Sequence, residues 1–156
     1  MALDILNRQR KVPISIKEIR PRLEAVVTAA GVNDSEISLV FVSDAAIKRL
    51  NKEWRGINDP TDCLSFAANE SPDFLDDFDG GFLGDIVISL ERAKAQGPIH
   101  LADDVPVGAD PLVEEVVFLF IHSLLHLLGY DHQKPAQAKK MQAEEQRLLN
   151  SPGVRW

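Results

Sequence analysis

The sequence has little of several features on which common protein classes depend. It contains one cysteine, Cys63, so no disulfide framework can form within it, and this usage is typical of a reducing compartment. Its longest apolar run, Val116 to Ile121, is far shorter than the roughly 20 residues that cross a bilayer. Residues 1–10 interrupt their apolar residues with charges and lack the apolar region of a signal peptide. We therefore expect a protein of a reducing compartment with no membrane partner.

The chain also lacks internal repeats and any linker rich in proline, glycine or serine. Its 156 residues are 45% hydrophobic and 26% charged, which is ordinary for a globular protein and unlike a disordered chain. A domain typically takes about 100–200 residues. We expect a single domain over residues 1–156.

Positive charge is scarce overall, since 17 basic side chains face 24 acidic ones and give a net charge of −7. The excess acid lies in residues 69–115, which hold twelve acids and two bases, whereas the remainder holds twelve acids and fifteen bases. We expect most of this acidic segment to be a solvated loop. An acidic chain binds nucleic acid poorly through counterion release, so no DNA partner is expected.

Strand patterns and helix patterns are interspersed along the chain. Pro21 lies inside the first helical pattern, so that helix either is kinked in its first turn or begins at the proline. Residues 67–83 and 97–110 have loop compositions. The order of elements indicates an α/β or α+β fold with a small sheet. The patterns predict helices at 16–30, 45–54, about 111–128 and about 136–149, and strands at 36–43, 62–66 and 84–90.

Three histidines stand close together at the end of the most apolar helical pattern. His122 and His126 are four residues apart and so project from one helical face, and Gly129 can end the helix and let His132 approach the same point. Three neutral imidazoles are the ligand set of a catalytic zinc whose open fourth position holds an activated water. Histidines without metal are the alternative, but two imidazoles on a buried helix are costly unless their nitrogens are satisfied. His100 lies outside this pattern and is predicted to be a surface residue.

The same histidine spacing occurs in metzincin-type peptidases, which need glutamate directly after the first histidine as general base. This chain has Ser123 at that position, and its hydroxyl is no base at neutral pH without activation. The spacing therefore indicates a zinc hydrolase and disfavours a metallopeptidase.

Three sequence blocks resemble the YbeY family of bacterial endoribonucleases. They are the segment from Leu50 to Phe66, which includes Asn-Lys-Glu-Trp-Arg-Gly and Pro-Thr-Asp-Cys-Leu-Ser-Phe, then Leu83 to Ser89, and then His122 to His132. The blocks occur in the family's order and together run from about residue 50 to 132. Two departures are Ser123, where the family usually has glycine, and the Gly/Pro-containing segment after Ser89.

The resemblance implies an α+β (α/β-like) fold in which a small mixed sheet is covered by helices and a buried central helix carries two zinc ligands. It implies a zinc-dependent endoribonuclease of single-strand type in the bacterial cytoplasm, acting in small-subunit ribosomal RNA 3′ end maturation and ribosome quality control. One Zn²⁺ would be held by His122, His126 and His132, with Arg55 as the functional arginine. Partners would be ribosomal RNA and the small ribosomal subunit, including one of its proteins.

A guanidinium such as that of Arg55 can stabilise the negative charge that develops on a phosphodiester during cleavage. Asp131 and Ser123 are candidates for residues that contact the metal ligands without binding the metal, and Asp131 could orient a zinc-bound histidine. An exposed acid in a turn is an equal alternative for Asp131. Cys63, in an apolar strand, is expected to be a core residue. A ribosome-assembly factor with a structural zinc remains a further alternative, and would need a fourth ligand to close the site.

Overall fold

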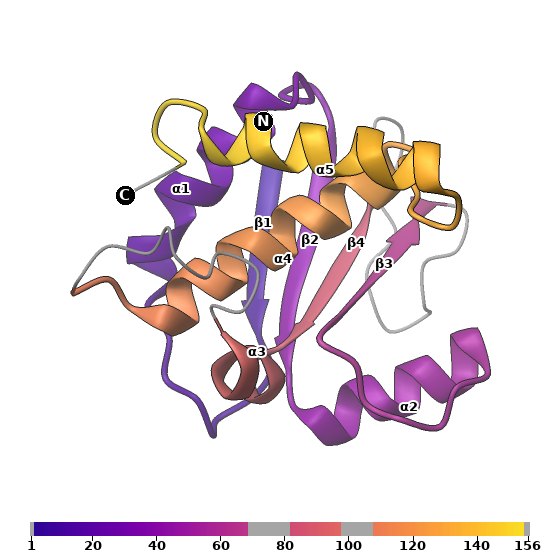
Figure 1. Cartoon of the computed structure of the whole chain (residues 1–156). Helices are drawn as coiled ribbons and strands as arrows, with labels where there is room; N and C mark the ends of the chain where they lie inside the picture. Colours follow the sequence, from indigo (N-terminus) through magenta and orange to yellow (C-terminus); the bar gives the residue numbers. More distant parts are fainter. Residues whose placement is uncertain (1, 69–81, 98–107, 155–156) are drawn as a thin grey trace.

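The computed structural model describes residues 2–68, 82–97 and 108–154 (Figure 1). The elements follow one another along the chain in an α+β arrangement that agrees with the expected fold class. They are β1 (Ala2–Asn7), α1 (Ile16–Ala29), β2 (Glu36–Val42), α2 (Asp44–Arg55), β3 (Cys63–Ala67), β4 (Phe82–Ser89), α3 (Leu90–Gln96), α4 (Pro111–Leu127) and α5 (Pro135–Leu149).

The four strands form one mixed sheet in the order β1-β2-β4-β3. Strands β1, β2 and β4 are parallel, and β3 is antiparallel to β4. One face packs against α1, α4 and α5 through a large core that includes Leu39, Phe41 and Ile88. The alternate residues Val40, Val42 and Val87 point to the other face, which α2 covers. The central strands β2 and β4 are thus buried on both sides, whereas Asp4 and Leu6 of the edge strand β1 are exposed.

Local signals explain where several helices begin and end. Ser15 and Ser43 accept hydrogen bonds from the first turns of α1 and α2, and Asp110 does the same for α4. Gly56 follows α2 with a φ of 74°, in the left-handed region that favours glycine. Helix α1 begins at Ile16 and continues through Pro21, so it does not start at the proline.

The structure differs from the sequence-based expectations at the edge strand β1 and directly after the inner strand β4. Strand β1 was not expected, and residue Leu90 opens the unexpected helix α3 instead of ending a strand. The acidic segment, residues 69–115, was expected to be mostly a solvated loop. Three of its acids, Asp85, Glu114 and Glu115, are instead buried in β4 and α4. Residues 69–81 and 98–107, with His100 among them, fall outside the described residues. No helix in the described ranges is long and apolar enough to span a membrane.

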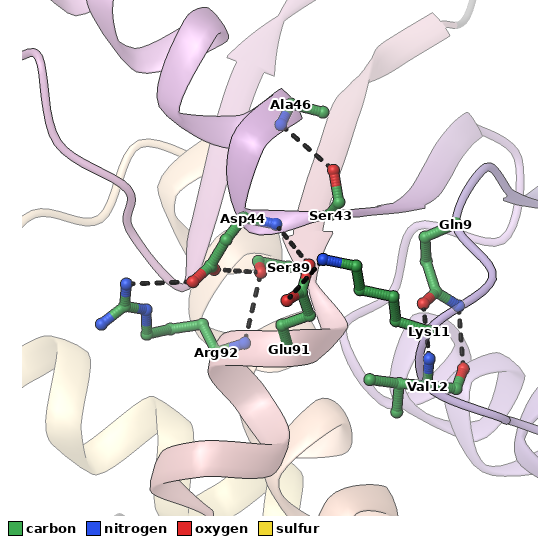
Figure 2. Close-up of polar contacts among 9 residues, drawn as sticks. All are labelled: Gln9, Lys11, Val12, Ser43, Asp44, Ala46, Ser89, Glu91 and Arg92. Carbon is green, nitrogen blue, oxygen red and sulfur yellow. Dashed lines mark hydrogen bonds and ion pairs between the residues drawn. The ribbon is translucent and has the colours of Figure 1, made fainter.

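A polar network joins the starts of α2 and α3 where the adjacent strands β2 and β4 end (Figure 2). The Ser89 hydroxyl donates to Asp44 Oδ1 (2.7 Å), and Arg92 donates to Asp44 Oδ2 (3.1 Å). In return, the backbone N–H of Asp44 donates to Glu91 Oε1 (3.1 Å), and Lys11 lies 3.8 Å from the other Glu91 oxygen. The network fixes the direction in which α2 leaves the sheet, and therefore where its last residue, Arg55, lies.

Candidate metal centre

The carboxyl end of α4 places two imidazoles against each other. His122 and His126 are half-buried, and their Nε2 atoms are 3.2 Å apart with the ring planes at 83°. The preceding turns of the helix are almost wholly buried, because Val116 to Ile121 pack into the core. The core therefore fixes the backbone from which both rings project.

Gly129 brings a third imidazole to the same point. Its φ of 99° is in the left-handed region, and the N–H of Tyr130 closes the turn by donating to the Leu125 carbonyl (3.0 Å). The chain then reverses, and the ring of His132 lies with its centroid 5.6 Å from that of His122 and 5.2 Å from that of His126. One nitrogen from each of the three rings lies within 4.8 Å of the others.

The remaining nitrogens of the two helical histidines have fixed partners. His126 donates from Nδ1 to the backbone carbonyl of Tyr130 (3.0 Å), which can only accept, so its Nε2 carries a free lone pair. His122 donates from Nδ1 to Glu145 Oε2 (2.8 Å), a buried carboxylate on α5. Burial lowers the pKa of His126, and the neighbouring His122 and His132 lower it further. Near neutral pH this ring is therefore uncharged, as a metal ligand must be.

The geometry of the triad fits a tetrahedral metal ion. Two nitrogen ligands at about 2.0–2.1 Å from a zinc ion are separated by about 3.3 Å in a tetrahedral site, and the two Nε2 atoms are 3.2 Å apart. Two lone pairs this close repel unless a cation or a proton lies between them. Hydrogen bonds from Nδ1 to a carboxylate and to a carbonyl are also the usual way in which proteins orient such ligands. The triad can hold a metal ion.

Arg55 reaches the same region from the other face of the sheet. Its Nη2 donates to the Ser65 carbonyl (2.9 Å), and its guanidinium carbon lies 4.9 Å from the centroid of the Phe66 ring. These contacts hold an exposed arginine along β3, which packs against α4. Arg55, Ser65 and His126 line one open hollow of about 350 Å³. The structure therefore brings the arginine and one histidine of the triad, His126, to a shared space.

The other sequence candidates lie around the triad in different ways. The Asp131 carboxylate accepts from the backbone N–H of His132 (2.7 Å), so it contacts the backbone of that residue. Ser123 is buried on α4 beside the Cys63 thiol. Burial raises the pKa of that thiol, with Asp62 contributing, and the ligand group contains only the three histidines among the described residues. The ring partners that the structure reveals are Glu145 and the Tyr130 carbonyl.

Sequence reasoning missed Glu145, although a signal was present. Glu145 is four residues after Met141 and three before Leu148, so it falls on the apolar stripe by which α5 packs against the core. A carboxylate on a buried stripe needs a partner, and this one points to His122. The carbonyl of Tyr130 had no signal, because a backbone acceptor does not depend on residue type.

Comparison with known proteins agrees with the geometry. The profile of the family described as "Endoribonuclease YbeY" matches residues 4–153. The chain is 37% identical over 163 residues to the endoribonuclease YbeY of Moorella thermoacetica, covering 99% of both proteins. It is 41% identical over 135 residues to that of Desulfitobacterium hafniense, covering 84% of this chain and 80% of the relative. The solution structure of TM1509 from Thermotoga maritima has a similar fold, with a TM-score of 0.54, 22% identity and coverage of 94% and 89%.

Proposed function

The chain belongs to the YbeY family of endoribonucleases, and from this premise we propose that it is a zinc-dependent endoribonuclease of ribosomal RNA. Its substrate would be single-stranded RNA at the 3′ end of the small-subunit ribosomal RNA, and its wider role ribosome quality control. The proposal includes one catalytic domain over residues 1–156, action in the bacterial cytoplasm and a small-subunit protein as partner. The relatives' names support cleavage of RNA, and the convergence of three imidazoles supports the metal.

The observation that best supports this proposal is the distance of 3.2 Å between the Nε2 atoms of His122 and His126. In each ring the other nitrogen, Nδ1, is already hydrogen-bonded to a different group. Glu145 holds the ring of His122 and the Tyr130 carbonyl holds that of His126, so both free lone pairs point into one space. His132 completes the set from the turn after α4. A zinc ion bound there supplies Lewis-acid stabilisation of phosphate charge and lowers the pKa of a water ligand.

Arg55 has the role of binding the phosphate group of the phosphodiester bond that is cleaved. Its guanidinium lies on the wall of the hollow that His126 also lines, and a planar guanidinium can donate two hydrogen bonds to non-bridging phosphate oxygens. Its contacts with Ser65 and Phe66 keep it in place before the substrate binds. Negative charge that grows on the phosphate during cleavage would therefore meet a positioned cation.

Two observations separate this function from the alternatives. Ser123, at the position where a peptidase needs glutamate, is buried beside Cys63 and carries a hydroxyl that is no general base. A structural zinc would normally have four protein ligands, and the ligand group holds three histidines and no fourth ligand among the described residues. Both observations favour a site that leaves one position for a substrate or water.

The experiment compares wild type with His126→Ala for zinc content and for cleavage of a 5′-labelled small-subunit RNA 3′ end fragment. His100→Ala is the matched control, since it removes the one histidine outside the triad. We expect His126→Ala to lose both zinc and cleavage, and the control to keep both. Removal of zinc from wild type by a chelator should abolish cleavage, and zinc should restore it. Cleavage that survives the loss of zinc would contradict the proposal, and histidine-dependent hydrolysis of casein would support a peptidase instead.

A further inference from the structure

Lys134, directly before helix α5, and two lysines of its first half form a concentration of positive charge that the metal centre does not use. Lys134, Lys139 and Lys140, here called the lysine strip, lie in residues 132–143, which contain no acidic side chain. The other residues carry a net charge of −10, with 14 basic against 24 acidic side chains. All three lysines are exposed, and among the described residues none makes a hydrogen bond or ion pair. The strip is a local exception to an acidic chain.

The acids nearest to the strip are already engaged. Glu144 accepts two hydrogen bonds from Arg147, at 2.7 and 2.9 Å, and that pairing lowers the pKa of its carboxyl. Asp131 accepts from the backbone of His132, and Glu145 accepts from the ring of His122. None of these carboxylates contacts a lysine of the strip. Within the part of the chain that the structure describes, the positive charge is therefore available to an anion.

One lysine of the strip, Lys140, lines a hollow beside the turn that follows α4. Lys140 and Gln137 form one wall of this hollow of about 320 Å³, and the turn after α4, from Leu128 to Asp131, forms the other. The same turn supplies the Tyr130 carbonyl that holds His126. His126 in turn lines the hollow that contains Arg55. The linings of the two hollows include the neighbouring residues Leu127 and Leu128 at the end of α4. Helix α5 and strand β3 each pack on α4 (Figure 1).

We propose that single-stranded RNA lies across the triad from Arg55 to the lysine strip, with the strip binding phosphates on one side of the cleaved bond. This inference rests on the proposed function, because it takes RNA as the substrate and the triad as the place of cleavage. A chain with a net charge of −7 gains little from generic attraction to RNA. Its binding energy must come from local cations, and Lys140 of the strip lines a hollow beside the turn that holds His126.

The proposal predicts a specific salt dependence. Each lysine that neutralises a phosphate of a single strand adds about 0.7 to the slope of log K against log salt. Replacing all three lysines by glutamine should lower that slope by about 2, and should weaken binding on the order of 100-fold near 100 mM salt. The strip does not touch the triad's ring partners, so zinc content should stay at the wild-type level.

The experiment measures fluorescence anisotropy of a short 5′-fluorescein-labelled single-stranded oligoribonucleotide with full-length, zinc-loaded protein at several salt concentrations. The test variant carries Lys134→Gln, Lys139→Gln and Lys140→Gln. The control carries Lys17→Gln, Lys48→Gln and Lys94→Gln, which remove the same charge from exposed positions on α1, α2 and α3. Titrations are kept on ice, and a gel confirms that the RNA remains intact. Lys140→Gln alone should lower the slope by about 0.7, which guards against misfolding of the triple variant.

We expect the slope to fall in the strip variant and to remain close to wild type in the control. Equal losses in both variants would overturn the proposal in favour of overall charge. An unchanged slope in the strip variant would also overturn it, and weaker binding of polyglutamate in that case would assign the strip to an acidic protein. RNA cleavage by wild type is measured separately. Failure there would contradict the proposed function, whereas the binding slopes would still decide where RNA lies.

Discussion

The two ends of α4 both place polar side chains in the most apolar part of the protein, but they satisfy them differently. At the amino end, Glu114 accepts two hydrogen bonds from Arg22, at 2.6 and 2.8 Å, and Glu115 accepts one from Gln96 at 2.8 Å. At the carboxyl end, His122 and His126 point free nitrogens toward each other.

This difference separates a structural polar cluster from a binding site. At the amino end side-chain donors face the two carboxylates, and the contacts tie α1 and α3 to α4. At the carboxyl end acceptor faces acceptor, which is stable only with a cation or proton between them. The buried polar groups at the two ends of this helix thus have different roles. A group that faces a hydrogen-bond donor is structural, whereas two acceptors that face each other indicate a binding site.

The largest effect on stability is expected at the amino end. Arg22→Ala leaves the Glu114 carboxylate buried without its cation, and breaking such a pair costs about 3–5 kcal/mol of unfolding free energy. Arg147→Ala is the matched control, because Arg147 pairs with Glu144 in the same two-bond manner at the surface and should cost about 0–1 kcal/mol. Denaturant unfolding measures both. Equal losses would show that burial does not distinguish the two pairs.

The next effect is expected on catalysis alone. Arg55→Ala should lower the cleavage rate about 100- to 1,000-fold, as removal of a positioned transition-state donor does, and leave zinc content unchanged. Arg49→Ala, an exposed arginine on the same helix, is the control and should keep near-normal activity. Single-turnover cleavage and metal analysis are the measurements. Full activity in Arg55→Ala would remove this residue from the mechanism.

A smaller effect should appear in metal affinity. Glu145→Gln weakens the acceptor that orients His122, and loss of such a partner typically lowers metal affinity about 10- to 100-fold. Glu144→Gln changes the neighbouring carboxylate, which faces Arg147, and should leave zinc affinity at the wild-type value. Competition with a chelating dye gives both dissociation constants. Equal zinc affinities in the two variants would mean that Glu145 acts only in packing.

The smallest effect is expected at Cys63, on the strand that packs against α4. Because burial raises the pKa of its thiol, little thiolate forms at mildly alkaline pH, and alkylation of the native protein should be slow. The thiol should react readily once the protein unfolds. Zinc should not change the native rate, since Cys63 is outside the triad. Protection by zinc, measured by mass spectrometry of iodoacetamide adducts, would instead make Cys63 part of the metal site.

The fold could be predicted from the sequence where local patterns were long. The helices α1, α4 and α5 end within about one residue of their expected limits, because caps and apolar periodicity agree there. Strand β1 was missed because its order depends on pairing with β2, about 34 residues later in the register, and no local signal encodes that partner. Helix α3 has only seven residues, too few to show a helical period after an apolar strand.

The residues of the candidate site also differ in how far the sequence could predict them. His122, His126 and His132 lie within eleven residues of each other, so helical spacing and one glycine were enough to predict their convergence. Arg55 was found through a sequence block, and its position beside His126 required the sheet. Glu145 could not be assigned to His122 from the sequence, since the contact depends on how α5 crosses α4. Contacts between elements were therefore the part that needed the structure.

The contact between Glu145 and His122 has a consequence for the order of synthesis. A ribosome makes the three histidines before it makes Glu145, so the triad emerges without the carboxylate that orients one of its rings. Helix α5 can pack against α4 only after its own residues have left the exit tunnel. The orientation of His122 by Glu145 is thus complete only after α5 has left the exit tunnel and packed against α4.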